Sequence, residues 1–410
     1  MALQSTRSEM TDAAAASPSN RTASRRVGAL TDIGVERMGD AADLLSDPRV
    51  LRLENLDTDL LPPEPALRAT ERAVRDDDAN SYLPFFGHNA LRVAATDLVT
   101  RLAGLPSGRY DWRRQCFISA GGLSGIFNTL LACIDPGDEV VMTSPAYVGL
   151  INRVRLAGGV PRFVPLVPGA QGWRLDLDAL RAAVSPRTRA FLMMSPSMPT
   201  GAVFDAAEWH VVCEACVAAD AWMIYDAAME RLLFDGVEHI HPASLPGMAE
   251  RTITIGALSK EYRMIGWRVG WVVCPLALAE ALARVSLSNV VTPVGIAQPA
   301  AAAAILAEDD GIAACTAQWQ ARRDLLLAEL RGFARVRPQG GWSLLIDMAP
   351  LGLSGKEASR ALLERAQIAA TSMENWGLPD TARYLRLVFA NEPLERLAGI
   401  GARMRAALGA

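Results

Sequence analysis

The chain has 410 residues, half of them hydrophobic, with a formal net charge of −4 and an isoelectric point near 5.7. This length corresponds to two or three domain lengths and allows a large buried core. The acidic balance and the lack of a basic patch exclude a typical nucleic-acid-binding protein. No apolar run reaches the roughly 18 residues that span a membrane.

Six irregularly spaced cysteines do not form a disulfide framework. Cys213 and Cys216 form a CxxC pair without a second pair or a histidine cluster, so we interpret them as core thiols and expect no metal site. Residues 1–28 are rich in Ala, Ser, Thr and Arg and predict a flexible arm. The arm lacks the apolar stretch of a secretory signal, and Glu9 and Asp12 argue against a transit peptide. A cytoplasmic protein is therefore expected.

Short apolar runs alternate with helical patterns between about residues 90 and 275. The predicted strands are Gln115–Ser119, Glu139–Thr143, Pro161–Pro165, Ala190–Met194, Trp222–Tyr225, Thr252–Ile255 and Val269–Val273. The predicted helices are Ser124–Ile134, Leu150–Ala157, Leu177–Ala183 and Ala206–Ala219. This alternation indicates an α/β domain with a mostly parallel sheet and helices on both faces.

The alanine-rich stretch Gln298–Arg331 predicts one long helix that leads into a second, smaller unit. There, Trp342–Asp347 and Tyr384–Phe389 are typical of strands, and Lys356–Gln367 of a helix. A final helix is predicted from Glu392 onward. This second unit, roughly residues 333–410, has an α+β pattern.

The segment Leu258–Gly270 places Lys260 beside Ser259, with Arg268 eight residues later in an apolar stretch. Desolvation lowers the pKa of a lysine, and the free amine is then available as a nucleophile that forms a Schiff base. The arginine could hold a phosphate group by paired hydrogen bonds. Pyridoxal phosphate (PLP) requires both groups. The alternative interpretation is a surface lysine that precedes a Gly-Trp strand.

Two segments on the predicted sheet add candidate cofactor contacts. Ser119–Ser124 is a glycine-rich turn between a strand and a helix, which is either an anion site at the helix N-terminus or a tight connection. Tyr147 follows a Ser-Pro turn at a strand end, where it could stack on a planar ring or pack in the core.

Two charged residues stand in strands that are otherwise apolar. Asp226 follows Trp222–Tyr225, and a buried carboxylate there requires a partner, such as a protonated pyridine nitrogen. Its alternative role is a helix N-cap. Arg386 lies inside Tyr384–Phe389 and also needs a partner, either an α-carboxylate that fits its planar fork or an internal ion pair.

Together these residues resemble the fold type I PLP-dependent enzymes, specifically the class I/II aminotransferase family, over roughly residues 50–405. The strongest similarity runs from Ser259-Lys260 through Gly266-Trp267-Arg268-Val269-Gly270, and the order and spacing of the motifs match. Further similar segments are Ser81–Gly87 with Leu91-Arg92, Asp135–Asp138, Pro199–Gly201 and Gly340–Trp342.

The resemblance implies the aspartate-aminotransferase-like fold. Residues 61–300 would form a large domain with a seven-stranded, mostly parallel sheet. Residues 301–332 would form a connecting helix to a small domain over residues 333–410. Residues 29–60 would form an N-terminal segment that packs on the small domain.

The resemblance also implies site roles. Lys260 would form the internal aldimine and carry the proton between Cα and the cofactor's C4′ atom. Asp226 would pair with the pyridinium nitrogen, Tyr147 would stack on the ring, and Arg386 would bind the substrate α-carboxylate. The implied phosphate ligands are the backbone amides of Gly122 and Leu123, with Ser259 and Arg268.

Tyr82 matches a family tyrosine that reaches into the neighbouring subunit's site, which implies a homodimer. No nucleic-acid or membrane partner is expected, and the implied substrates are an amino acid and a 2-oxo acid.

Three positions depart from the family pattern. An asparagine usually precedes Pro199, and a tyrosine usually follows the aspartate by three residues, and both donate hydrogen bonds to the cofactor's phenolic oxygen. This sequence has Met198 and Met229 there, and Ala257 where a phosphate-binding serine is often found. Because a thioether donates no hydrogen bond, we expect a raised aldimine pKa, unless water or another side chain substitutes.

The leading functional hypothesis is transamination of an amino acid. The alternative is another PLP reaction of specialised biosynthesis: elimination, replacement or cyclisation of an amino-acid side chain. A PLP-binding regulator is a third hypothesis, but residues 1–50 are too short and irregular for a helix-turn-helix domain.

The sequence indicates the side chain of the substrate less clearly than its α-carboxylate. Aspartate-type members add an arginine from the partner subunit, and the corresponding region, Thr292–Val294, holds none, which argues against a dicarboxylic substrate. Trp342 and Trp376, with the two methionines, could form an apolar substrate pocket or pack in the core. The polar residues that could bind a polar or cationic side chain, or cap a turn, are Asn55, Asp57 and Asp59.

Overall fold

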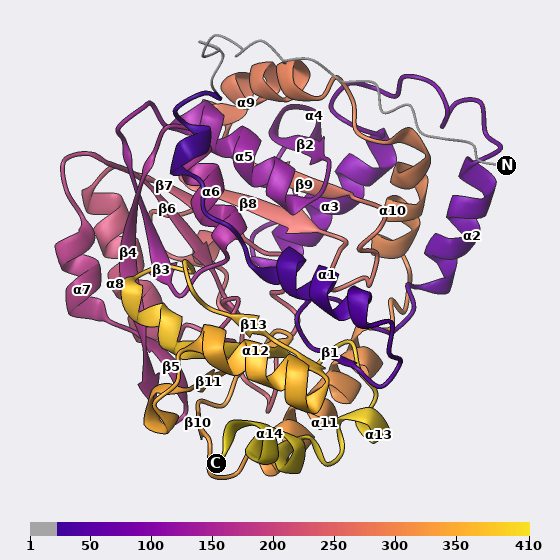
Figure 1. Ribbon diagram of the computed structural model, residues 1–410. Coiled ribbons are helices and arrows are strands. Elements are labelled where there is room, and N and C mark those ends of the chain that lie inside the picture. The colour runs from indigo at the N-terminus through magenta and orange to yellow at the C-terminus, as the bar shows by residue number, and fades with distance from the viewer. Residues whose placement is uncertain (1–22) are drawn as a thin grey trace, which may run out of the picture.

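The structure is a computed structural model that describes residues 23–410, so most of the predicted arm over residues 1–28 lies outside the described residues. An eight-stranded sheet forms the centre of the large domain, in the order β2-β9-β8-β7-β6-β3-β4-β5 (Figure 1). Its strands are β2 (Cys116–Ser119), β3 (Glu139–Ser144), β4 (Val160–Gly169), β5 (Gly172–Leu175), β6 (Thr188–Met194), β7 (Trp222–Asp226), β8 (Thr252–Ala257) and β9 (Gly270–Val273).

The α/β class and the mostly parallel sheet are confirmed, but the sheet has eight strands and not the predicted seven. Strands β4, β3, β6, β7 and β8 run parallel, whereas β9 is antiparallel to both of its neighbours. The additional strand β5 folds back on β4, with Gly169 opposite Gly172. The prediction missed this hairpin because it ended the preceding strand at Pro165.

Successive strand residues pack against helices on opposite faces of the sheet, as period-two alternation requires. Phe191 and Tyr225 belong to the core on the face covered by α7 and α8, whereas Leu192 and Ile224 belong to the core beneath α5, α6 and α9. The large-domain helices are α2 (Glu64–Ala73), α3 (Asn89–Leu102), α4 (Trp112–Gln115), α5 (Gly122–Cys133), α6 (Val148–Leu156), α7 (Leu177–Ala183), α8 (Ala206–Ala218), α9 (Leu276–Asn289) and α10 (Gln298–Ile305).

The predicted single helix Gln298–Arg331 is wrong, because the chain forms α10 and then a separate helix α11 (Ile312–Glu329). Gly311 adopts a left-handed backbone with φ of 73° at the start of α11. The carboxylate of Asp310 accepts the backbone N–H of Ile312 and pairs with Arg231 at 2.6 Å. This turn interrupts a stretch whose alanine content favours an uninterrupted helix.

The small domain contains a four-stranded antiparallel sheet in the order β10-β11-β14-β13. Its elements are β10 (Ala334–Arg335), β11 (Ser343–Asp347), β13 (Thr371–Ser372), β14 (Tyr384–Val388), α12 (Gly355–Ala366), α13 (Leu394–Leu397) and α14 (Ile400–Leu408). The predicted final helix is divided by Gly399, which has φ of 79°. The described residues also form five short 3-10 helices: Val27–Ala29, Pro242–Ser244, Gly295–Ala297, Ala349–Leu351 and Pro379–Arg383.

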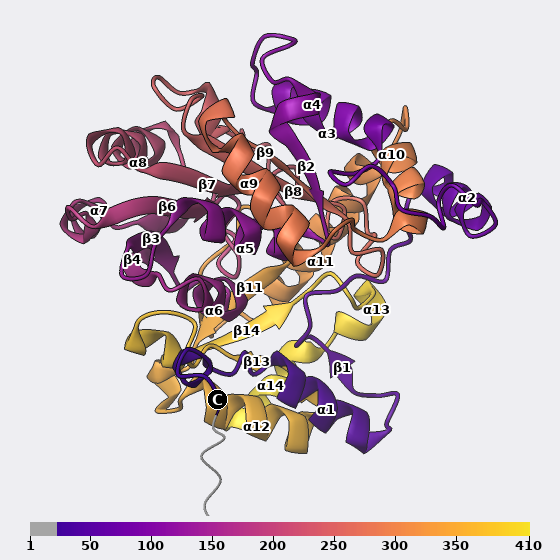
Figure 2. The ribbon, with the colours of Figure 1, turned by 90° about the horizontal axis from the view of Figure 1, so that it is seen from above.

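The N-terminal segment joins the small domain. Helix α1 (Val35–Leu45) lies beside α12, and strand β1 (Leu51–Arg52) pairs in parallel with β12 (Ile368–Ala369) (Figure 2). Further along, the N–H of Leu53 donates to the carbonyl oxygen of Ala369, and the carbonyl oxygen of Leu53 accepts the N–H of Val388. The segment thereby passes along the edge of the large domain where β3, β7 and β8 end. Across residues 23–410, no helix combines the length and the apolarity needed to cross a membrane.

Candidate active site

A pocket of about 230 Å³ lies at the carboxyl end of the central sheet. The N-terminus of α5, the loops after β3, β7 and β8, and strand β14 of the small domain all contribute to its wall. The predicted site residues that line it are Asn55, Gly122, Leu123, Tyr147, Met198, Asp226, Met229, Ser259, Lys260, Arg268 and Arg386.

Lys260 lies in the loop between β8 and β9, which closes through a hydrogen bond from the Leu258 N–H to the Val269 carbonyl. Its Nζ donates to the carbonyl oxygen of Leu56 at 2.5 Å and lies 5.1 Å from the centre of the Trp342 ring. Burial lowers the pKa of Lys260 from 10.5 to about 8, and the Asp57 carboxylate opposes this shift. At this pKa about a tenth of the amine is neutral at pH 7, far more than for an ordinary lysine, and this neutral form can act as a nucleophile.

Glycines bring a strand end, a helix N-terminus and a guanidinium together. A Cβ on Gly121, which has φ of 82°, would stand 2.7 Å from a terminal nitrogen of Arg268. A Cβ on Gly270 would stand 2.7 Å from the backbone nitrogen of Gly122. Arg268 itself has φ of 54°, an uncommon conformation for a non-glycine residue. Its guanidinium donates to the hydroxyl of Ser259 at 3.2 Å, so donors from three segments face one end of the pocket, where they fit an anion.

Asp226 ends β7, and its carboxylate faces the pocket with one backbone hydrogen bond, from the N–H of Ala228 at 3.1 Å. Burial raises the pKa of Asp226 to about 6. Tyr147, at the start of α6, lines the same pocket. Asp226 forms no salt bridge within residues 23–410, and the nearby Lys260 charge only partly offsets the effect of burial on its pKa, so the carboxylate fits a ligand that brings its own positive charge.

Arg386 is fully buried on β14 and is held by neutral groups only. It donates to the carbonyl oxygen of Glu54 and to the hydroxyl of Thr371, and its Nε has no hydrogen-bond partner among residues 23–410. Its guanidinium carbon lies 4.8 Å from the centre of the Trp376 ring. Burial lowers the pKa of Arg386 to about 10. A buried cation without a carboxylate partner is costly, so the guanidinium fits a bound carboxylate.

The pocket therefore fits the charged groups of PLP and an amino acid. The anion end at Arg268 fits the phosphate, Asp226 fits the pyridinium nitrogen, and Arg386 fits an α-carboxylate. Lys260 lies between these three groups, and its amine forms no ion pair with a carboxylate in the described part of the chain.

The three departures from the family pattern lie at the pocket, whose lining includes Met198, Met229 and Ala257. The Sδ atom of Met198 lies 3.8 Å from a terminal nitrogen of Arg386. A Cβ on Gly122 would stand 3.3 Å from the Cβ of Ala257, so Ala257 lies directly against the start of α5.

Four further predicted residues do not line the pocket. Trp342 and Trp376 are fully buried behind Lys260 and Arg386 respectively. Tyr82 is 79% exposed on the surface of the single chain. Asp59, unlike Asp57, is engaged elsewhere, because it forms a paired salt bridge with Arg322 at 2.6 Å.

Sequence reasoning missed several wall residues, of which Leu56 is the most consequential because its carbonyl oxygen accepts the Lys260 hydrogen bond. A backbone acceptor carries no signal in the sequence. Val35, Met194 and Ile265 also line the pocket, and their apolar side chains are indistinguishable in sequence from core residues.

Comparisons with known proteins show the family of the chain. Residues 50–399 match the family described as aminotransferase class I and II. Arginine–pyruvate transaminase AruH of Pseudomonas aeruginosa is 35% identical over 351 residues, which cover 84% of this chain and 87% of that protein. The probable N-succinyldiaminopimelate aminotransferase DapC of Mycobacterium tuberculosis is 38% identical over 317 residues, 76% of this chain and 78% of that protein.

Solved structures show the same fold. The N-succinyldiaminopimelate aminotransferase of Mycobacterium tuberculosis superposes with a TM-score of 0.86 at 32% identity, over 94% of this chain and 100% of that one. Aspartate aminotransferase of Thermus thermophilus with maleate gives a TM-score of 0.82 at 29% identity, over 95% and 98% of the two chains. The chain belongs to the class I and II aminotransferase family, the fold type I PLP-dependent enzymes.

Proposed function

We propose that this aminotransferase acts on the α-amino group of an amino acid, with Lys260 as the residue that holds PLP and then moves the proton at the substrate Cα. The observation that carries the proposal is the partly buried Lys260 amine, which has a lowered pKa and shares one pocket with Asp226, Arg268 and Arg386. None of these three charges has an oppositely charged partner in residues 23–410. PLP, when bound, supplies an electron sink for the charge that develops at Cα.

The other residues hold and orient the reactants. Arg268, Ser259 and the first amides of α5 bind the phosphate, while the Asp226 carboxylate keeps the ring nitrogen protonated. Tyr147 packs against the ring. The arrangement fixes the ring relative to Lys260, and such positioning accounts for a large part of catalysis in enzymes of this kind.

Arg386 binds the substrate α-carboxylate. Its fork-shaped donor set matches a carboxylate, and its hydrogen-bond partners in the protein are all neutral. Because the α-carboxylate brings the missing negative charge, its binding stabilises a guanidinium that is otherwise buried without a counter-ion. The bound substrate then presents its Cα to Lys260.

The pocket favours a substrate with a neutral or cationic side chain. Arg268 and Arg386 are the arginines that line the pocket of the single chain, and each has an assigned anion, so neither of them is left for a distal carboxylate. Asp57 lines the pocket without an ion-pair partner in this part of the chain. Among the relatives, one is named for arginine as its amino donor.

A single-turnover experiment tests the proposal. Holoenzyme mixed with one amino acid and no 2-oxo acid should release at most one equivalent of 2-oxo acid per active site, and addition of pyruvate should restore multiple turnovers. Lys260→Ala should abolish both reactions, whereas Lys356→Ala, at an exposed lysine, should not. Multiple turnovers without any 2-oxo acid would contradict transamination.

A second candidate is a PLP reaction that eliminates, replaces or cyclises a substrate side chain. The two methionines at the pocket wall favour it, because neither Met198 nor Met229 can donate a hydrogen bond to the cofactor. The same experiment separates the two, since such a reaction consumes the amino acid repeatedly without any 2-oxo acid; a replacement reaction needs an added nucleophile instead.

We also propose a homodimer through the surface that carries Tyr82. Tyr82 and Phe85 are 79% and 54% exposed, and Val291 and Val294 are 48% and 51% exposed. The two segments adjoin, because a Cβ on Gly295 would stand 2.2 Å from the Ala79 carbonyl oxygen. An exposed apolar surface of this kind is typical of an interface.

A mixing experiment tests whether Tyr82 acts across the interface. Lys260→Ala and Tyr82→Ala proteins, unfolded and refolded together, should regain activity, because one site of each mixed dimer carries neither change. Sedimentation should give the mass of a dimer. A monomer, or no regain above the Tyr82→Ala protein alone, would contradict the proposal.

A further inference from the structure

Trp376 occupies the junction between the two domains, next to the proposed carboxylate site. It is fully buried, and its ring centre lies 5.6 Å from that of Tyr147 and 4.8 Å from the guanidinium carbon of Arg386. The Arg386 guanidinium therefore has an aromatic face on one side. This contact stabilises the cation without occupying any of the donors that a carboxylate would use.

The backbone around Trp376 is fixed to the large domain. Its carbonyl oxygen accepts the N–H of Ala146 at 2.8 Å, and the N–H of Leu378 donates to the Ser144 hydroxyl at 2.9 Å. A Cβ on Gly377 would stand 2.2 Å from that hydroxyl oxygen, so only glycine allows this approach. The indole is thus held rigidly relative to the turn that carries Tyr147.

The indole N–H reaches a third part of the molecule. It donates at 3.2 Å to the carbonyl oxygen of Ile33, which belongs to the segment of residues 31–35, here called the N-terminal strap. The strap is also held at Thr31, whose backbone N–H and carbonyl bond the side-chain amide of Asn152 at 3.2 and 2.8 Å. Val35, at the other end of the strap, lines the active-site pocket.

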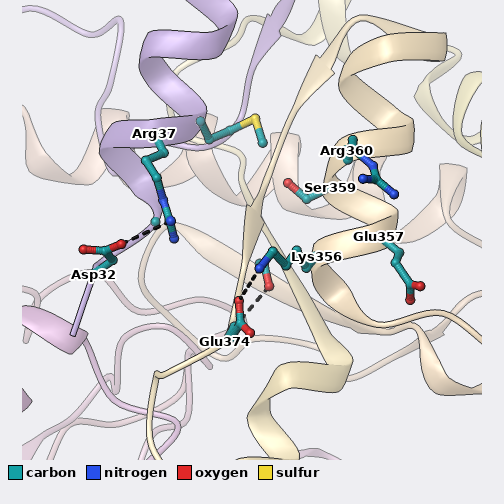
Figure 3. Close-up of a pocket in the computed structure, with 10 residues that line it drawn as sticks. Asp32, Arg37, Lys356, Glu357, Ser359, Arg360 and Glu374 are labelled. Atoms are coloured by element: carbon teal, nitrogen blue, oxygen red, sulfur yellow. Dashed lines mark hydrogen bonds and ion pairs between the residues drawn. The ribbon is translucent and has the colours of Figure 1, made fainter.

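The outer side of the strap is open. A hollow of about 360 Å³ separates the strap and the start of α1 from α12 and the loop after β13 (Figure 3). Arg37 pairs with Asp32 on one wall, and Lys356 pairs with Glu374 on the other, and no ion pair of the described residues crosses between the walls. The strap is therefore held at its inner side, by Trp376 and Asn152.

We propose that Trp376 is a positioning residue with two separable roles: its ring orients Arg386 for the α-carboxylate, and its N–H holds the N-terminal strap over the pocket. The first role rests on the proposed function, because it takes Arg386 as the carboxylate site. The second role rests on the hydrogen bond to Ile33 alone.

Two substitutions separate these roles. Trp376→Phe keeps an aromatic face and removes the N–H, whereas Trp376→Leu removes both. Trp173→Phe is the matched control, because Trp173 is a buried indole of the large domain whose N–H has no partner. Asn152→Ala releases the other strap anchor without touching Arg386.

Strap exchange and ligand affinity are measured on the holoenzyme. Hydrogen–deuterium exchange of peptides that cover residues 29–36 reports the strap. Affinity for 2-methylalanine, followed by the cofactor absorbance, reports the carboxylate site, because this amino acid has an α-carboxylate but no α-hydrogen. Loss of transamination therefore does not affect either readout.

Trp376→Phe should accelerate strap exchange about tenfold, as expected for the loss of one hydrogen bond, with 2-methylalanine affinity within about threefold of the original. Trp376→Leu should also weaken 2-methylalanine about tenfold or more, with a rise in KM that exceeds any fall in kcat. Asn152→Ala should accelerate exchange at unchanged affinity, and Trp173→Phe should change neither.

Unchanged strap exchange in Trp376→Phe would overturn the strap role. Unchanged affinity in Trp376→Leu would overturn the positioning of Arg386. If Trp376→Leu does not fold, Trp376→Met takes its place, because it also removes the aromatic face, and unchanged 2-methylalanine affinity in Trp376→Met would overturn the positioning of Arg386.

Discussion

Lys260 Nζ donates a 2.5 Å hydrogen bond to the carbonyl oxygen of Leu56, a residue 204 positions earlier in the chain. The acceptor is neutral, so it orients the amine without supplying the negative charge that would stabilise the ammonium form. Burial then dominates and lowers the pKa of Lys260 to about 8. The N-terminal segment in this way positions the nucleophile while leaving it reactive.

The rate of cofactor binding should follow this pKa. Only the neutral amine attacks an aldehyde, so the rate of reconstitution of the apoprotein with PLP should rise about tenfold per pH unit below pH 8 and level off above it. Stopped-flow absorbance measures this rate. The control Lys356→Arg should give the same profile, and a rate that still climbs towards pH 10 would mean that Lys260 has an ordinary pKa.

Asp226 should govern cofactor affinity through its charge. Removal of one partner of a buried ion pair costs about 3–5 kcal/mol, so Asp226→Asn should weaken PLP binding by at least about 100-fold. Asp226→Glu keeps the charge and should lose less. Because the pKa of Asp226 in the free pocket is about 6, affinity should also fall as pH drops below 6, where the carboxylate becomes protonated.

Equilibrium dialysis against PLP measures the affinity of Asp226→Asn and of the unaltered protein for the cofactor. Asp178→Asn, at a fully exposed carboxylate on α7, serves as the control and should bind normally. Equal affinities of Asp226→Asn and the unaltered protein would show that the ring nitrogen lies elsewhere.

Much of the fold could be predicted from local sequence patterns. Buried parallel strands produce continuous apolar runs, and Ala190–Met194 in β6 and Trp222–Tyr225 in β7 were predictable for that reason. The long-helix prediction failed over Leu306–Gly311, where a tertiary ion pair between Asp310 and Arg231 and a left-handed glycine override helix propensity. Local patterns contain no information about such a partner.

Some residues of the candidate site could likewise be predicted from local sequence, and others could not. Lys260, Asp226 and Arg386 are chemically conspicuous because a charged group in an apolar run needs a partner. The roles of Leu56 and Val35 arise only when the N-terminal segment docks on the pocket, and neither residue type indicates this position. Asp57 and Asp59 are equivalent in sequence, but Arg322 engages only Asp59.

The absence of hydrogen-bond donors at residues 198 and 229 should affect the spectrum of the bound cofactor. The Schiff base at Lys260 should lose its proton at a higher pH than in relatives that carry the donors. Met229→Tyr introduces a phenolic donor and should lower the midpoint of the absorbance titration by about one pH unit or more, as expected for a charge-assisted hydrogen bond.

Met229→Leu is the matched control for this titration, because it keeps an apolar side chain of similar size at a buried position and should leave the midpoint unchanged. A Met229→Tyr midpoint equal to that of the control would mean that water or another side chain already bonds the phenolic oxygen.

Chemical trapping of the cofactor tests the central claim most directly. The chain contains only two lysines, Lys260 in the pocket and Lys356 on the surface. Borohydride reduction of the PLP-loaded protein, followed by digestion and mass spectrometry, should place one phosphopyridoxyl group on Lys260 and none on Lys356. Modification of Lys356 instead, or no modification at all, would contradict the account.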